Sequence, residues 1–173
     1  HGFCMSYSCE TQIIYFTHKL HQILDRSSHA DCIFLDFSKA FDKVPHGLLL
    51  HKLNQLSIDK SLLTLIEYFL TDRSQFAVAN QFCSSFSPVY SGVPQGFVLG
   101  PLLFLIYIND LPSLLKSNVL LFADDCVIFR EITSDNDTTT LQSDLNSVVN
   151  WSKTWLMELN TNKCKTMRVS RTK

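Results

Sequence analysis

Two adjacent carboxylates, Asp124 and Asp125, lie in the middle of a ten-residue run, 120–129, whose other members are apolar. Strand-forming residues on both sides of the acids predict a tight β-hairpin with the two acids at its tip. Two like charges held side by side between apolar strands repel each other unless a cation lies between them. The pair is therefore either a metal site or a surface turn, since Asp is also a common turn former.

A third acid interrupts another apolar segment. Residues 32–37 form a short apolar strand that carries Asp36 where only apolar residues would be expected. With 42–96 set aside as an insertion, the predicted order of elements is strand, helix, strand, strand, helix, strand, which is the ferredoxin-like pattern. Its first and third strands are antiparallel neighbours about 4.8 Å apart, so Asp36 is expected beside Asp124 and Asp125.

Three convergent carboxylates predict a particular chemistry. Oxygen ligands of this kind suit hard cations such as Mg²⁺ or Mn²⁺, which share their coordination with substrate phosphates. Two such ions about 4 Å apart clamp the attacking and leaving oxygens of an in-line phosphoryl displacement. The acids therefore predict phosphoryl transfer, although carboxylates alone do not distinguish a polymerase from a nuclease.

Local patterns supply the elements that must position these acids. The predicted helices begin after the caps Ser8, Asp59 and Asp137 or at the prolines Pro45 and Pro101. They end near 27–28, Leu56, Leu70 and Asn109, and the helix from Pro101 is apolar on every side and expected to be buried. The helix after Asp137 is expected to bury one face, made of Leu141, Leu145, Val148, Val149, Ser152, Trp155 and Leu156. A hairpin around Asn80-Gln81 and a last strand, Lys165 to Ser170, complete the prediction.

Composition limits the classes of function. The 173 residues, 46% of them hydrophobic, suffice for one domain with a core. A formal net charge of −1 excludes nucleic-acid binding by overall charge, so any such contact must use local patches such as the basic stretch 163–173. Six Cys residues without a C-x-x-C pair indicate reduced thiols, and we expect an intracellular location, nuclear or cytoplasmic. The longest apolar stretch, 97–108, is shorter than the roughly 20 residues that span a bilayer.

Four separated segments carry a resemblance to a known family. They are FLDFSKAFD at 34–42, SGVPQG at 91–96 with VLGPLLF and YINDLP following it, FADD at 122–125, and 151–164 with its Trp-x-x-x-Trp pattern. In order and spacing they resemble the reverse transcriptase domain of non-LTR (LINE-like) retrotransposons. The resemblance implies an α+β fold, a ferredoxin-like (βαββαβ) polymerase palm with an inserted, partly helical fingers segment. The palm would comprise 30–42 and 91–173, and partial fingers 1–29 and 43–90.

The resemblance also implies roles for single residues. Asp36, Asp124 and Asp125 would be the catalytic acids that hold two Mg²⁺ or Mn²⁺ ions, and Lys163 would lie near the leaving pyrophosphate. The residues implied to contact the dNTP are Phe37, Lys39, Ala40, Phe41, Gln95 and Gly96. Among them Phe41 matches the bulky gate that excludes a ribose 2′-hydroxyl. The implied activity is RNA-directed DNA polymerisation, the transfer of a nucleotide from a dNTP to a primer 3′-hydroxyl.

The implied partners are an RNA template, a DNA primer and dNTPs, with no membrane. We expect the chain to be a piece of a longer polyprotein that also carries thumb and endonuclease domains. Two positions depart from the family pattern: Cys4 stands where relatives have Arg, and Phe97 stands where a small residue is typical. The alternative is therefore an inactive remnant or a nucleic-acid-binding module with the same fold. A two-metal nuclease is disfavoured by Phe41 and by the Gln95-Gly96 turn, which hydrolysis does not require.

Overall fold

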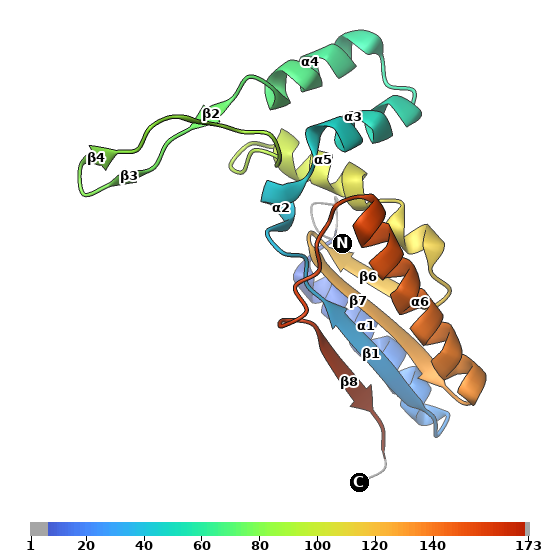
Figure 1. Cartoon of the computed structure of the whole chain (residues 1–173). Coiled ribbons are helices and arrows are strands. Elements are labelled where there is room, and N and C mark those ends of the chain that lie inside the picture. The colour runs from blue at the N-terminus through green and yellow to red at the C-terminus, as the bar shows by residue number, and fades with distance from the viewer. Residues whose placement is uncertain (1–6, 172–173) are drawn as a thin grey trace. The chain divides into compact units, whose positions relative to one another are not determined.

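The computed structural model describes residues 7–171, which form two compact units (Figure 1). One unit, here called the sheet unit, comprises 7–38 and 108–171 of the described residues. The other, the inserted unit, is Lys39–Tyr107. Of the described residues, 7–38 belong to the sheet unit and 91–107 to the inserted unit.

The sheet unit contains a four-stranded antiparallel sheet. Its strands are β1 (His29–Leu35), β6 (Asn118–Phe122), β7 (Asp125–Ile132) and β8 (Lys165–Val169), and their order is β6-β7-β1-β8. When β1, β6, β7 and β8 are counted as strands 1 to 4, their order starting from β8 is 4-1-3-2. The first and third strands, β1 and β7, therefore lie at the centre of the sheet. The ferredoxin-like topology predicted from the sequence is therefore confirmed. β1 ends at Leu35, so Asp36 follows the strand instead of lying within it.

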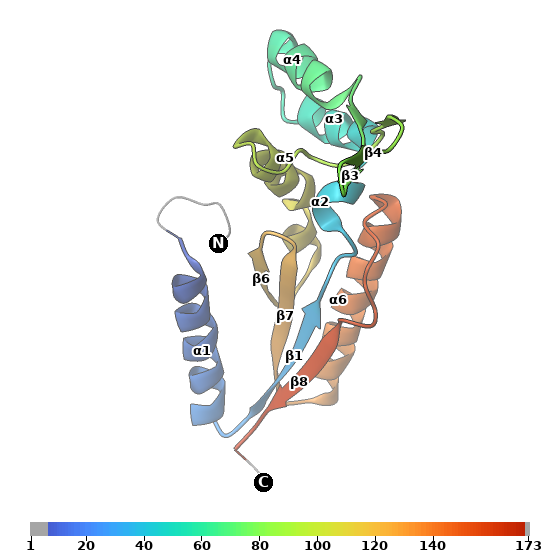
Figure 2. The same cartoon turned by 90° about the vertical axis from the view of Figure 1, so that its left-hand side faces the viewer.

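Helices cover both faces of this sheet. Figure 2 shows α1 (Cys9–Asp25) on one face and α6 (Asp135–Thr154) on the other. The α1 face holds a core cluster that joins Leu20 and Ile23 of the helix to Cys32, Leu120 and Phe129 of the strands. On the α6 face, the rings of Phe37 and Trp151 meet edge to face at 5.9 Å. The predicted cap of α1 is confirmed, since Ser8 and Thr11 form a capping box.

The start and the buried face of α6 differ from the prediction. The helix is capped by Ser134, and Asp137 is the third helical residue, whose carboxylate accepts bonds from the Ser134 hydroxyl and backbone amide. Both residues fit the capping pattern, which explains the three-residue error. The buried positions are Leu141, Asp144, Val148, Trp151 and Ser152, whereas the predicted Leu156 is exposed. Asp144 is buried because its carboxylate accepts the backbone N–H groups of Lys116 and Ser117.

The inserted unit is built from short elements. They are α2 (Ala40–Lys43), α3 (His46–Gln55), α4 (Lys60–Leu70), β2 (Ser74–Gln75), β3 (Val78–Ala79), β4 (Phe82–Cys83) and β5 (Ser87–Pro88). Asp59 caps α4, as predicted, by accepting a bond from the Ser61 amide. The predicted hairpin is also present, with Asn80 and Gln81 both at positive φ, although its arms pair only in short pieces. The sequence did not predict α2 or the 3₁₀ turn η1 (Leu111–Leu114).

Helix α5 (Leu99–Ile108) begins two residues before the predicted Pro101. Leu103, Phe104 and Tyr107 are buried, but Leu102 is 51% exposed, so the expectation of burial on every side is wrong. Gly100 is tightly enclosed, because a Cβ atom there would lie 2.1 Å from the carbonyl oxygen of Pro94. Among residues 7–171, no helix is long and apolar enough to cross a membrane.

Candidate active site

Asp36 is fixed in place by the segment that follows α6. The backbone of Phe37 bridges to Leu159, the Ser38 N–H donates to the Glu158 carbonyl at 2.7 Å, and the Asn160 N–H donates to the Asp36 carbonyl at 2.8 Å. Because this segment continues directly into Lys163, it brings the Lys163 ammonium to 3.6 Å from the Asp36 carboxylate. Two residues that the sequence assigned to one site are thus in ionic contact.

The other two acids occupy different parts of the β6–β7 hairpin. Phe122 pairs with Asp125 as the last strand pair, so Ala123 and Asp124 form the two-residue turn. Ala123 has φ of 54°, a left-handed conformation that is unfavourable for a residue with a side chain. The prediction that both acids lie at the tip therefore holds for Asp124 alone, while Asp125 is the first residue of β7.

The strand register brings the third acid to this hairpin. Leu35 pairs with Cys126 in an antiparallel ladder, so the next step along both strands sets Asp36 opposite Asp125. The pKa of the Asp125 carboxyl is raised, first by burial and then by the neighbouring Asp124 and Asp36 carboxylates, with Lys163 acting in the opposite direction. Asp36, Asp124 and Lys163 are thus all near enough to influence the charge of Asp125.

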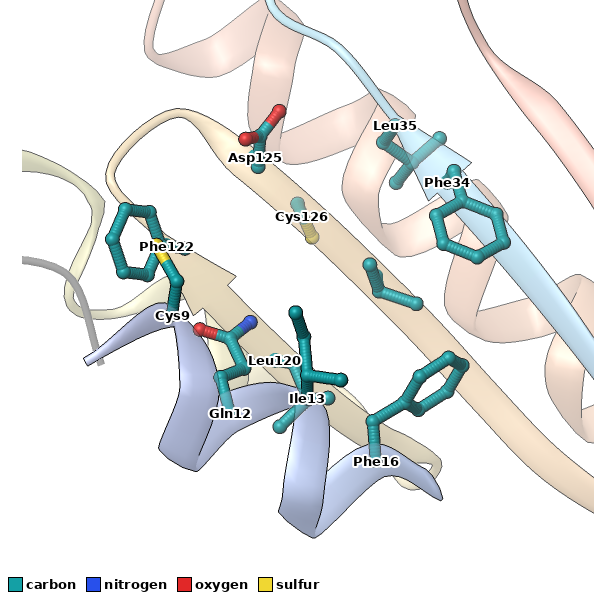
Figure 3. Close-up of a pocket in the computed structure, with 11 residues that line it drawn as sticks. Cys9, Gln12, Ile13, Phe16, Phe34, Leu35, Leu120, Phe122, Asp125 and Cys126 are labelled. Carbon is teal, nitrogen blue, oxygen red and sulfur yellow. The ribbon is translucent and has the colours of Figure 1, made fainter. Parts of the chain in front are cut away.

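Figure 3 shows what surrounds Asp125. It lies at one end of a largely apolar cavity of about 400 Å³ between α1 and the sheet. Phe122, Leu120 and Val127 line the sheet side, and Ile13 and Phe16 line the helix side. Because these neighbours are apolar, they keep water away from the Asp125 carboxyl, and this burial is the main cause of its raised pKa.

The donor set of the site fits divalent metal ions by its chemistry. Carboxylate oxygens are the ligands that Mg²⁺ and Mn²⁺ prefer. The pKa of Asp125 is raised first by burial and then by the Asp124 and Asp36 carboxylates, whose negative charge a bound cation would offset. Within residues 7–171, however, no three His, Cys, Asp or Glu side chains converge closely enough to hold a metal ion. Asp36 and Asp125 are thus neighbours across the paired strands, but the acids do not lie close enough together to surround a metal ion.

The residues implied to contact the nucleotide lie in the inserted unit, with one exception. Lys39 is exposed and precedes α2, Gly96 has φ of 84°, and the Gln95 amide donates to the Asp42 carboxylate at 3.3 Å. The Phe41 ring stacks on Phe104 with centroids 4.4 Å apart and an angle of 24° between the planes. Ala40 is buried.

The exception is Phe37, which belongs to the sheet unit and is 2% exposed against Trp151. Its side chain therefore supports the sheet and is not open to a nucleotide. Of the two departures from the family pattern, Phe97 is 56% exposed and meets the Phe69 ring edge to face. Cys4 lies outside the described residues.

Sequence reasoning missed the residues that position the acids. Glu158 and Asn160 hold the 36–38 segment through their backbone groups, and Asp110 accepts the indole N–H of Trp151 at 3.1 Å. All of them lie in segments that carried the family resemblance, and that was the available signal. Their partners are distant in sequence, so no local pattern disclosed the contacts.

Comparison with known families and proteins identifies the same family as these segments do. The family model described as "Reverse transcriptase (RNA-dependent DNA polymerase)" matches residues 4–173. The RNA-directed DNA polymerase from mobile element jockey of Drosophila funebris is 31% identical over 172 residues, covering 94% of this chain and 19% of that protein. A probable RNA-directed DNA polymerase from transposon X-element of Drosophila melanogaster is 35% identical over 148 residues, covering 80% of this chain and 16% of that protein. The chain thus spans about a fifth of the length of these relatives or less.

Solved structures share the fold at low sequence identity. Apo telomerase from Candida tropicalis, truncated from its C-terminal domain, superposes with a TM-score of 0.69 at 13% identity, covering 94% of this chain and 36% of that one. Telomerase from Candida albicans, in complex with a TWJ fragment of telomeric RNA, gives a TM-score of 0.68 at 15% identity, covering 96% and 31%.

Proposed function

The chain belongs to the reverse transcriptase family, and on that premise we propose that it carries the polymerising centre of a retrotransposon RNA-directed DNA polymerase. The observation that carries the proposal is the meeting of Asp36, Asp125 and Lys163 at the ends of β1 and β7, with Asp124 in the adjoining turn. Asp36 and Asp124 would hold the divalent ions, and Asp125 would support them. When bound, the two ions would activate the primer 3′-hydroxyl and neutralise the charge that develops on the pyrophosphate.

Lys163 has the position and charge for a role at the leaving group. Its ammonium lies 3.6 Å from the Asp36 carboxylate, and its side chain is otherwise largely exposed. We propose that it places positive charge near the leaving pyrophosphate. The hydrogen bonds between 158–160 and 36–38 would hold Lys163 and Asp36 in a fixed relation during this step.

Nucleotide selection would be the work of the inserted unit. The Phe41 ring is stabilised by its stacking on Phe104, so it presents a stiff surface that would exclude a ribose 2′-hydroxyl and favour dNTPs. Gln95 and Gly96 would contact the nucleotide, and the backbone amides of Lys39 and Ala40 would face the triphosphate. The name of the relatives, RNA-directed DNA polymerase, supports RNA as the template. A DNA primer is a further part of the proposal. Thumb and endonuclease domains of a longer polyprotein remain part of this proposal.

Primer extension on an RNA template with Mg²⁺ tests the proposal. Substitution Asp124→Asn should lower extension by about a hundredfold or more, because it removes a ligand charge at the reacting phosphate. Asp135→Asn is the matched control, since Asp135 is an exposed acid in the first turn of α6 and should leave extension unchanged. Extension that survives Asp124→Asn would overturn the assignment of the site.

A further inference from the structure

The β3–β4 hairpin of the inserted unit leaves two strand edges uncovered. Among residues 7–171, β3 and β4 pair with each other and with no further strand. Figure 1 shows them at the far end of an arm, residues 74–88, that extends away from α3 and α4. The outer edge of such a strand carries backbone N–H and C=O groups that a strand of another chain can bond.

The arm also exposes large apolar side chains. Phe82 is 80% exposed and Phe86 is 71% exposed, and Val78 of β3 is exposed as well. The Phe86 ring meets the Phe76 ring edge to face at 5.0 Å, and both rings remain exposed. Apolar side chains that gather in this way on a surface are typical of a place where a protein contacts another protein or a membrane.

No charged side chain protects the edges of the hairpin. Residues 74–109 contain no Asp, Glu, Lys, Arg or His. Natural edge strands are usually kept from pairing with other chains by charged residues or by proline. The β3–β4 pair has neither, since Pro88 lies in β5.

The lack of charge favours a second copy of this chain as the partner. Nucleic acid is bound through cations, and the arm has none. Two identical charged surfaces repel where like charges meet, whereas uncharged hairpins approach each other without this cost. A strand also complements its own copy, because two antiparallel strands related by a twofold axis present the same bonding groups to each other.

The hydrogen bonds of the hairpin determine which residue can lie at the twofold axis. The Ser84 N–H donates to the Ala77 carbonyl across the hairpin at 2.9 Å, so Ser84 turns its backbone groups inward. Neighbouring residues of a strand turn these groups to opposite sides, so the N–H and C=O of Cys83 face the outer edge of β4. Cys83 can therefore exchange two backbone hydrogen bonds with Cys83 of a second copy.

We propose that two copies of the chain pair along β4 as antiparallel neighbours, with the two Cys83 residues opposite each other. Each Phe82 then lies opposite Ser84 of the other copy, and the two Phe82 rings are diagonal neighbours within reach of each other. The two hairpins join into one four-stranded sheet that covers both β4 edges. The contact is small, so the dimer is weak and reversible. This inference goes beyond the proposed function and does not rest on it.

Sedimentation velocity in reducing buffer, at protein concentrations from about 1 to about 500 μM, tests the inference and should show a monomer–dimer equilibrium. Phe82→Glu should raise the dissociation constant of the dimer at least about tenfold, because two like charges then meet across the axis. Tyr68→Glu is the matched control and should dimerise like the wild type, since Tyr68 is 73% exposed on α4, outside the arm. Asp124→Asn should also dimerise like the wild type while it loses primer extension.

Thiol crosslinking tests the register without a change in β4. Among the described residues, Cys9 and Cys83 are the exposed cysteines. The double variant Cys4→Ser/Cys9→Ser keeps Cys83, and a short bismaleimide should join two copies of it, because residues in this type of strand pair have Cα atoms about 5.5 Å apart. The double variant Cys4→Ser/Cys83→Ser keeps Cys9 and should not be joined.

A chain that stays monomeric at every concentration would overturn the inference, as would equal dimerisation of Phe82→Glu and the wild type. Crosslinking through Cys9 with none through Cys83 would overturn the β4 register. Binding of the monomer to phosphatidylcholine vesicles or to RNA 12-mers that Phe82→Glu abolishes would also overturn the inference, because a membrane or a nucleic-acid strand would then cover the hairpin.

Discussion

At the scale of single residues, the raised pKa of Asp125 shows that its environment disfavours the charged carboxylate. Its pKa is raised by burial and by the carboxylates of Asp124 and Asp36, so the native chain holds this proton more tightly than the unfolded chain does. Below the ordinary pKa of an aspartate, Asp125 is protonated in both the native and the unfolded state, and its contribution to the free energy of unfolding is at its full value. That contribution is lost as the pH rises through the raised pKa of the native state.

From this we expect that Asp125→Asn stabilises the metal-free protein at neutral pH, raising the midpoint of thermal unfolding by about 2 °C in EDTA. Near pH 3 the gain should vanish, because Asp125 is then protonated in the wild type as well. Added Mn²⁺ should raise the midpoint of the wild type more than that of Asp125→Asn. Differential scanning fluorimetry measures all three effects, with Asp135→Asn as the control. A lower unfolding midpoint for Asp125→Asn in EDTA at pH 7 would show that the charged Asp125 carboxylate does not destabilise the native state.

At the scale of elements, the start of α5 depends on one close backbone contact. Gly100 lies in the first turn of the helix, where a Cβ atom would approach the Pro94 carbonyl oxygen to 2.1 Å. That contact joins α5 to the 91–96 loop, which carries Gln95 and Gly96. The helix cannot accept a side chain at this position unless the loop moves.

Gly100→Ala should therefore destabilise the protein by about 1–3 kcal/mol, the usual cost of overpacking. Gly47→Ala is the matched control, because Gly47 lies in α3 with no atom within 4 Å of the added Cβ, and alanine there should stabilise the helix by about 0.5–1 kcal/mol. Chemical denaturation measures both variants. Equal stability of Gly100→Ala and the wild type would show that the 91–96 loop can move away from the added methyl group without a loss of stability.

Elements also explain which predictions from sequence succeeded. The neighbourhood of Asp36 and Asp125 followed from the order of strands and helices, because a ferredoxin-like sheet has only one place for its first and third strands. The cap of α6 was mistaken because Ser134 and Asp137 both suit a helix start. Burial of Asp144 depends on amides of Lys116 and Ser117, which no pattern within the helix discloses.

At the scale of the whole molecule, the resemblance to a family supplied what periodicity could not. Apolar spacing predicted most helices, yet the pairing of 158–160 with 36–38 depends on contacts between distant segments. Such contacts leave no trace in local sequence. The place of the candidate site was therefore predictable by topology and motif, while the groups that hold it in position were not.

The central place of β1 has a consequence for how the chain reaches its native state. β1 pairs on both sides with strands, β7 and β8, that lie far along the chain from it. Contacts within Lys39–Tyr107 close shorter loops, so this unit can become structured while β1 still lacks both neighbours. In pulsed hydrogen exchange during refolding, amides of α3 and α4 should gain protection before those of β1, and the amides of β1 should gain it together with β7 and β8. Protection of β1 ahead of α3 would contradict this order.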